Sequence, residues 1–228
     1  MPQAVETVKR KLAPRLIVQL SRMDARARMG ARVRRRLGRQ ARVELFFAFD
    51  DPNSAVAVID LVERLKGYDV LLLPKPVSNR GISKDPAVEQ KRCFALEDAR
   101  RLFARSDLTL KRQTMIDPKT TAFLARWVAS APPGQALSGF CAAACRRIWL
   151  EEAGEIDEAD YSNLWMNYFD AAPIAAGDTP VRSNERLMKS RGPYDTPAAW
   201  VHGQWFFAHD RLEQIAERLD DLGWGKQA

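Results

Sequence analysis

The chain has 228 residues, of which 46% are apolar, and a formal net charge of +7. This apolar content is enough for a hydrophobic core, which excludes a wholly disordered chain. The apolar stretch at residues 16–20 is too short for a membrane span or for the core of a secretory signal. Three cysteines in a chain of this length do not make a disulfide framework. We therefore expect a cytoplasmic protein.

The positive charge lies in an N-terminal arm, residues 1–42, which holds 13 basic and two acidic side chains. The rest of the chain is mildly acidic, with 23 basic and 27 acidic residues. Apolar residues recur along the arm at steps of three and four, which predicts an amphipathic helix interrupted at Pro14. They are Val5, Val8, Leu12, Leu16, Leu20, Met23 and Ala27.

The sequence leaves two alternatives for what this arm contacts. It packs either on its own body or on a second copy in a homodimer, or it binds an anionic surface of lipid headgroups or nucleic acid. We do not expect specific nucleic-acid binding, because such proteins usually place positive charge on the folded body.

The body begins with a strand–helix–strand pattern. Residues 43–49 alternate with both faces nearly apolar, as in a buried central strand. Asp51 followed by Pro52 predicts a helix start, and the apolar pattern continues to the stop signal at Lys66-Gly67. A second strand is expected at residues 70–73, closed by prolines. Together these elements predict a right-handed βαβ unit.

Helices are expected in the middle of the chain, with starts at Asp85-Pro86 and Asp117-Pro118, and residues 171–181 read as a loop. Residues 198–207 predict a hairpin around Gly203, followed by a helix capped by Asp210. The order βαβ, several helices, ββα predicts an α/β thioredoxin-like fold over residues 43–223. Its all-helical insert would cover about residues 85–181.

Three segments resemble the DsbA-like thioredoxin-fold family, and in particular 2-hydroxychromene-2-carboxylate isomerases and kappa-class glutathione transferases. Residues 47–54, Phe-Ala-Phe-Asp-Asp-Pro-Asn-Ser, are similar to the active-site turn. Residues 196–201, Thr-Pro-Ala-Ala-Trp-Val, resemble the segment that holds the cis-proline. Residues 207–212, Phe-Ala-His-Asp-Arg-Leu, are similar to the Asn-Asp-Arg-Leu signature of the isomerases.

The resemblance implies a glutathione site and its residues. The positions that match catalytic residues are Asp51 and Ser54. The positions that match cofactor-binding residues are Pro52, Asn53, Thr196, Pro197, His209 and Asp210. Asp210 has a second interpretation, as a helix cap, and no metal-ligand spacing recurs along the chain.

The turn departs from the family pattern at Asp51, where the isomerases have Ser and the DsbA-like oxidoreductases have Cys. Disulfide exchange needs a thiolate, which neither Asp51 nor Ser54 supplies. Asp51 is either an N-cap of the following helix or a general base. The leading hypothesis is a glutathione-dependent isomerase or transferase acting on a small hydrophobic substrate. The alternative is a non-catalytic binding or scaffold protein with the same fold.

Overall fold

The structure is a computed structural model and describes residues 25–78, 86–151, 154–174 and 177–225. The chain divides into two compact units, Met1–Arg39 and Gln40–Ala228. Most of the predicted apolar stripe of the arm, and the break predicted at Pro14, lie outside the described residues. None of the helices within the described ranges is long and apolar enough to cross a membrane.

The first unit contains one described helix, α2 (Ala25–Arg36). Gly38 ends it with a left-handed backbone, φ +62°. The Gly38 N–H donates to the Arg35 carbonyl and the Arg39 N–H donates to the Arg34 carbonyl. This pair of hydrogen bonds is a Schellman motif, which satisfies the last carbonyls of the helix.

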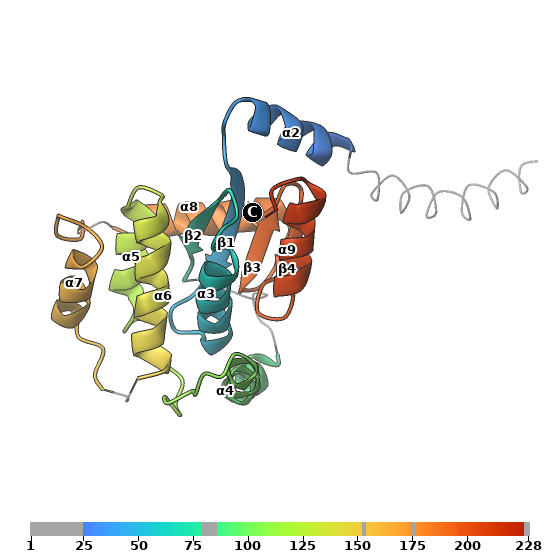
Figure 1. The fold of residues 1–228 in the computed structure, drawn as a ribbon. Helices are drawn as coiled ribbons and strands as arrows, with labels where there is room; N and C mark the ends of the chain where they lie inside the picture. The colour runs from blue at the N-terminus through green and yellow to red at the C-terminus, as the bar shows by residue number, and fades with distance from the viewer. Residues whose placement is uncertain (1–24, 79–85, 152–153, 175–176, 226–228) are drawn as a thin grey trace, which may run out of the picture. The chain divides into compact units, whose positions relative to one another are not determined.

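The second unit is built on a four-stranded sheet in the order β2-β1-β3-β4 (Figure 1). Strand β1 runs parallel to β2 and antiparallel to β3, and β3 pairs antiparallel with β4. The elements are β1 (Ala41–Phe47), α3 (Pro52–Arg64), β2 (Val70–Pro76), α4 (Val88–Arg105), α5 (Ala122–Ser130), α6 (Gln135–Trp149), α7 (Glu158–Met166), α8 (Thr179–Arg191), β3 (Ala198–Val201), β4 (Gln204–Phe207) and α9 (Leu212–Asp221).

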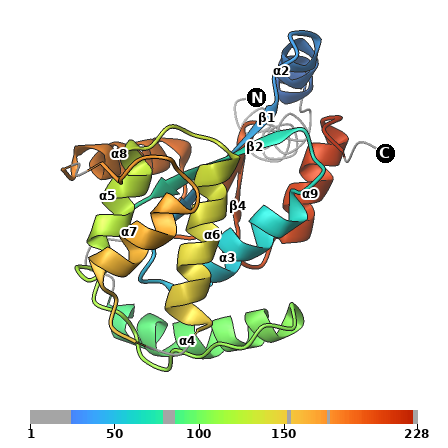
Figure 2. The same cartoon turned by 60° about the vertical axis from the view of Figure 1, so that its left-hand side comes forward.

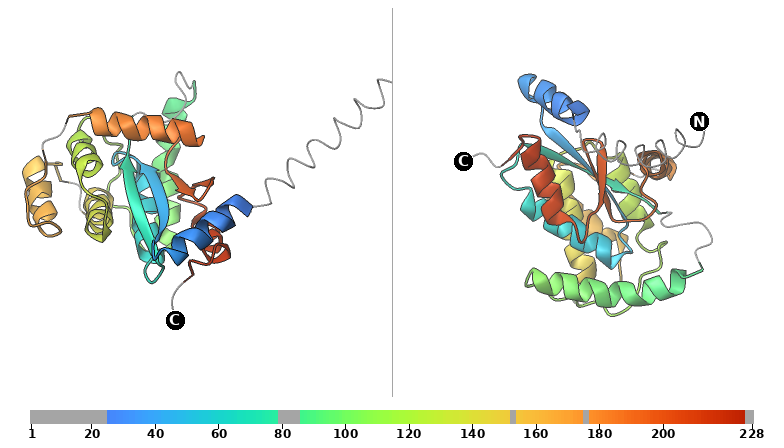
Figure 3. Two further views of the ribbon diagram at one scale, coloured as in Figure 1. Left: turned by 90° about the horizontal axis from the view of Figure 1, so that it is seen from above. Right: turned by 90° about the vertical axis from the view of Figure 1, so that its right-hand side faces the viewer.

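Helices cover both faces of the sheet, which explains why β1 is apolar on both sides. Helix α3 packs on α4, α6 and α9 in front of the sheet in the view of Figure 1. Helix α8 lies on the other face, where Met188 packs against Phe46 and Arg191 forms an ion pair with Glu44 at 3.3 Å (Figure 3). Helix α4 runs along the end of the unit where α3 begins (Figure 2).

The predicted βαβ unit and the ββα unit are both present. The hairpin turn has positive φ at both central residues, 43° at His202 and 96° at Gly203. This is the type I′ geometry that a two-residue hairpin favours.

Three local predictions were wrong, and a fourth is not tested. Strand β2 continues through Pro74 and Pro76, which an edge strand tolerates because one side of it needs no ladder donor. Helix α8 begins at Thr179, inside the loop predicted at residues 171–181. Helix α5 begins only at Ala122, because the Asp117 carboxylate accepts from Lys119 N and closes a turn first. The start predicted at Asp85-Pro86 is the untested one, because Asp85 lies outside the described residues; helix α4 begins at Val88.

Candidate functional site

The turn between β1 and α3 is held by two local hydrogen bonds and by a third from the end of α6. The Asp51 N–H donates to the Ala48 carbonyl at 3.2 Å. The Ala48 N–H donates to Ser54 Oγ at 3.1 Å. The indole N–H of Trp149, at the end of α6, donates to the Phe49 carbonyl at 3.1 Å. The helical insert therefore fixes the backbone of the turn.

Asp51 is the N-cap of α3. Its Oδ2 accepts from Ser54 N at 3.0 Å and from Ser54 Oγ at 2.6 Å, and the side chain is buried. The Ser54 N–H is one of the free donors in the first turn of α3, and Asp51 satisfies it. The N-capping interpretation of Asp51 therefore describes its contacts in the structure.

Ser54 is fully buried and has both its hydroxyl proton and an oxygen lone pair in hydrogen bonds. Its neighbour Pro52 is buried as the first residue of α3, and neither residue lines the cavity described next. A ligand in that cavity meets Asp51 and Asn53 instead. Ser54 thus acts on the site through Asp51, whose carboxylate it orients.

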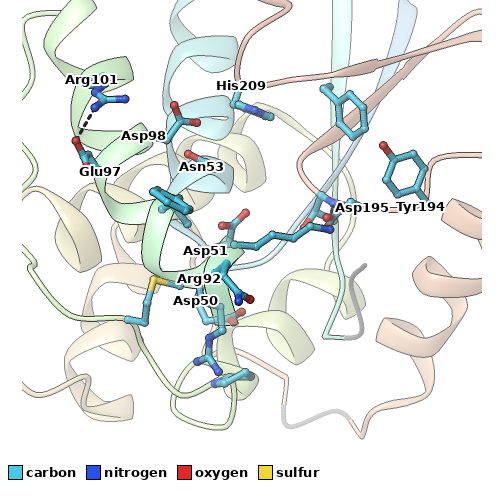
Figure 4. A pocket seen from close by; sticks show the side chains of 18 of the residues that line it. Asp50, Asp51, Asn53, Arg92, Glu97, Asp98, Arg101, Tyr194, Asp195 and His209 are labelled. Atoms are coloured by element: carbon cyan, nitrogen blue, oxygen red, sulfur yellow. Dashed lines mark hydrogen bonds and ion pairs between the residues drawn. The ribbon is translucent and has the colours of Figure 1, made fainter. Parts of the chain in front are cut away.

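A cavity of about 820 Å³ lies at the start of α3, within the size range of small-molecule sites. Its polar wall contains Asp50 and Asp51 from the turn, Asn53 from the first turn of α3, Asp195 from the loop before β3, and His209 after β4 (Figure 4). Thr196, next to Asp195, also lines it. Helix α4 supplies the opposite wall, with Arg92, Asp98 and the ion pair between Glu97 and Arg101. Aromatic side chains also line it, namely Phe94, Tyr194 and Phe207.

The Thr196–Pro197 peptide bond is cis, and it lies beside this cavity. Pro197 is buried, and its carbonyl accepts from Ala208 N at 2.9 Å. The Thr196 N–H donates to the Asp195 carboxylate at 2.8 Å. A peptide-like ligand that pairs with this N–H must therefore displace Asp195.

Three cavity residues each have a buried polar atom with no hydrogen-bond partner among the described residues. The atoms are Asn53 Oδ1, Thr196 Oγ1 and His209 Nδ1. They come from three separate segments that meet around one cavity. An unsatisfied buried polar atom costs about 1–3 kcal/mol. These atoms have almost no accessible surface, so a ligand in the cavity bonds to them only after their side chains rotate.

Asp210 lies away from this cavity and lines a second one of about 920 Å³ between α3, α4 and α9. Its prediction as a helix cap was wrong, because Arg211 occupies the N-cap position of α9 and Asp210 instead forms an ion pair with Arg211 at 3.7 Å. Only His209 borders both cavities among the residues predicted for the site.

The cysteines lie outside the cavity wall. Cys141 and Cys145 are buried in α6, and Cys93 is exposed on α4. Burial raises the pKa of the Cys141 thiol well above its ordinary value, and the charge of Cys145 raises it further. Burial also raises the pKa of the Cys145 thiol, with a further contribution from the negative charge of Asp51. Both thiols are therefore held in the unreactive neutral form.

Several residues of the cavity have no sequence signal that places them there. Phe94, Arg92 and Asp98 belong to a helix whose position depends on tertiary packing. Asp195 does have a signal, because it directly precedes the segment 196–201 that resembles the cis-proline loop. Among the described residues, no three His, Cys, Asp or Glu side chains gather as metal ligands would.

Comparison with known proteins identifies the fold. No protein-family model and no curated protein sequence matches the chain. The structure is similar to 2-hydroxychromene-2-carboxylate isomerase, with a TM-score of 0.61 and 15% identity over 80% of this chain and 96% of that chain. It is also similar to a probable DsbA oxidoreductase from Streptomyces coelicolor, with a TM-score of 0.59 and 16% identity over 83% of this chain and 92% of that chain.

The fold and the position of the turn define the class of protein. The chain is an α/β protein with the DsbA-like thioredoxin fold, as the resemblance of its three segments predicted. At 15% and 16% identity, the two solved structures identify the fold of this chain.

Proposed function

We propose that the protein is a glutathione-dependent isomerase or transferase that acts on a small hydrophobic substrate. The observation that carries this proposal is the set of three unpartnered polar atoms, Asn53 Oδ1, Thr196 Oγ1 and His209 Nδ1, around one cavity beside the cis-proline loop. The aromatic side chains of the same cavity provide an apolar surface for the substrate. The reaction class is taken from the isomerase, with which the chain shares the fold.

When bound, glutathione would supply a thiol as the nucleophile. Asn53, Thr196 and His209 would bind its polar groups. The Thr196 N–H would exchange its hydrogen bond to the Asp195 carboxylate for one to glutathione. Asp51 would oppose the thiolate, because two unit charges about 4 Å apart repel by about 4 kcal/mol at an effective dielectric of 20. That energy corresponds to a pKa change of about three, so the wild-type protein holds the neutral thiol.

The turn does not support dithiol oxidoreductase chemistry. Asp51 and Ser54 occupy the two positions that would need sulfur, and Cys141 and Cys145 are buried as neutral thiols. We expect no reduction of insulin by this protein at a rate comparable to thioredoxin. A rate that disappears on replacing Cys141 or Cys145 would show that these thiols are reactive.

A second candidate function is non-catalytic binding. The Asp51 contacts favour it, because the carboxylate oxygen Oδ2 caps α3 through Ser54 N and also accepts from the Ser54 hydroxyl. In this case the cavity still binds a ligand, but replacing Asp51 by Ser leaves the protein inactive.

The substitution Asp51→Ser separates these functions. It removes the negative charge and introduces a hydroxyl donor, so we expect the pKa of bound glutathione to fall by about three and any glutathione-dependent rate to rise. The measurements are calorimetric binding of glutathione, titration of thiolate absorbance in the complex, and a transferase assay with a nitroaryl chloride. Asp157→Ser is the matched control, because Asp157 caps α7 and does not line the cavity.

The outcomes are distinct. If neither the wild type nor Asp51→Ser binds glutathione, the cofactor is wrong. If the wild type already holds a thiolate near neutral pH, or if Asp51→Ser and Asp51→Ala both abolish an existing activity, then Asp51 is itself a catalytic group. Binding without activity in every variant identifies the non-catalytic protein.

A further inference from the structure

Helix α2 has an exposed apolar stripe. Met29, Val33 and Leu37 follow one another at steps of four residues, across α2 and the residue that ends it, so they share one face of the helix. Their exposed fractions are 60%, 49% and 61%, among the largest for apolar side chains in the described part of the chain. Three large apolar side chains in a row are more than the scattered single residues that a protein surface normally shows.

Arginines border this stripe. Arg32 lies three residues after Met29 and Arg36 lies three residues after Val33, which places each next to the stripe on the helix surface. Arg26 lies three residues before Met29, and all three arginines are exposed. The described helix contains no acidic residue. Long arginine side chains can keep their charge in water while their stems lie along an apolar layer.

We propose that α2 binds the surface of an anionic lipid bilayer, with the stripe of Met29, Val33 and Leu37 at the level of the acyl chains and Arg26, Arg32 and Arg36 at the phosphates. A basic helix with an apolar face is the pattern of helices that lie in the membrane interface. Each arginine near such a surface strengthens binding through the negative surface potential. This inference concerns the arm alone and does not depend on the proposed function.

Other occupants explain less of the helix. A nucleic acid neutralises the arginines but offers no apolar layer for the stripe. A second copy of α2 could cover the stripe, but it would bring another set of arginines close with no acidic residue in either helix to compensate. The anionic bilayer is complementary to the stripe and to the charges at once.

The test uses the full chain in flotation with lipid vesicles. We expect the wild type to bind vesicles of mixed phosphatidylglycerol and phosphatidylcholine, and to bind pure phosphatidylcholine at least about tenfold more weakly. The triple variant Met29→Gln, Val33→Gln, Leu37→Gln keeps every charge, and we expect it to bind the mixed vesicles at least about tenfold more weakly than the wild type. The control Met166→Gln, Ile174→Gln removes exposed apolar side chains from the other unit, and its binding should be unchanged.

The contribution of the three arginines is tested separately. Changing Arg26, Arg32 and Arg36 together to Gln should weaken binding to mixed vesicles at least about tenfold, whereas changing them to Lys should preserve it. Equal binding of the stripe variant and the wild type to mixed vesicles would overturn the proposal, as would failure of the wild type to bind them.

Two further measurements identify the competing occupants. If light scattering shows a dimer that the stripe variant converts to a monomer, a second copy covers the stripe and the lipid proposal is wrong. Salt-sensitive binding of duplex DNA that the stripe variant retains, without vesicle binding, would assign the arm to nucleic acid instead.

Discussion

The carboxylate of Asp51 changes what the start of α3 offers to a ligand. A helix N-terminus normally attracts anions through its free N–H groups and its dipole. Here Asp51 already provides the anion, and it accepts from both the backbone and the hydroxyl of Ser54. An anionic ligand group therefore competes with a built-in carboxylate at this point of the cavity.

Replacing Asp51 by Ala should lower the free energy of unfolding by about 1–3 kcal/mol. The substitution removes an N-cap, which contributes about 1 kcal/mol, and leaves the buried Ser54 hydroxyl without its acceptor. Urea denaturation of the two proteins measures the change. Asp157→Ala, at the exposed N-cap of α7, should cost no more than about 1 kcal/mol. Equal losses in the two variants would contradict the role of the buried Ser54 contact.

The buried thiols predict how stability depends on pH. Folding raises the pKa of Cys141 and Cys145, so both keep their protons in the folded state at a pH where the unfolded chain loses them. Their stabilising effect is therefore complete below about pH 8.5 and declines as the pH rises above it, by up to about 1.4 kcal/mol per thiol and pH unit. Urea denaturation between pH 8 and 9.5 measures this slope.

The double variant Cys141→Ala, Cys145→Ala should remove most of that slope. Alkylation of the native protein provides an independent check, since iodoacetamide should modify exposed Cys93 and spare the other two thiols. Rapid modification of Cys141 or Cys145 without denaturant would show that α6 opens readily.

At the scale of the elements, the helix start and the hairpin were predicted correctly, because residues next to them in the sequence determine them. The start of α3 depends on an Asp-Pro pair, and the hairpin depends on Gly203, and both signals lie within a few residues of the structure they specify. Helix α8 also has local signals, with Asp178 and Pro180 at its start and left-handed Gly192 at its end. Its mostly polar sequence buries only Val181, Asn184 and Met188, so no apolar stripe marks it as a helix.

The cavity was predictable only in part for the same reason. Its turn, its cis-proline loop and His209 carry recognisable residues, whereas the wall formed by α4 is positioned by packing against α3. The edge position of β2, which permits Pro74 and Pro76, is likewise a property of the sheet as a whole.

The hairpin between β3 and β4 provides a prediction for a single element. Gly203 has a φ of +96°, and a Cβ added there would meet no atom within 4 Å. Gly203→Ala should therefore destabilise the protein by about 1 kcal/mol through backbone strain alone. Gly154→Ala is the control, since that glycine is equally uncrowded without a positive φ. If thermal unfolding shows equal changes for both variants, the type I′ turn does not limit stability.

At the scale of the whole molecule, the two compact units differ strongly in charge. Residues 1–39 hold 12 basic and two acidic side chains, a net charge of +10, which leaves −3 on residues 40–228. Deleting residues 1–39 should therefore lower the isoelectric point from about 9.5 to below neutrality, with the near-ultraviolet circular dichroism of the body retained. Isoelectric focusing and the circular dichroism spectrum measure both effects. A molten spectrum after deletion would show that the body needs the arm in order to fold.

The hydrogen bond from Trp149 to the Phe49 carbonyl restricts how this fold can be modified by evolution or by design. Inserted segments are normally tolerated at exposed loops, where they can be exchanged or lost without effect on the rest of the domain. Here the last residue of α6 supplies the donor for a buried carbonyl in the turn that begins α3, 100 positions earlier in the chain. A chimera that exchanges the helical segment for that of another thioredoxin-fold protein therefore needs a replacement donor for the Phe49 carbonyl. Without such a donor, the exchange would disturb the turn that carries Asp51, even if the new segment is joined to the domain without strain.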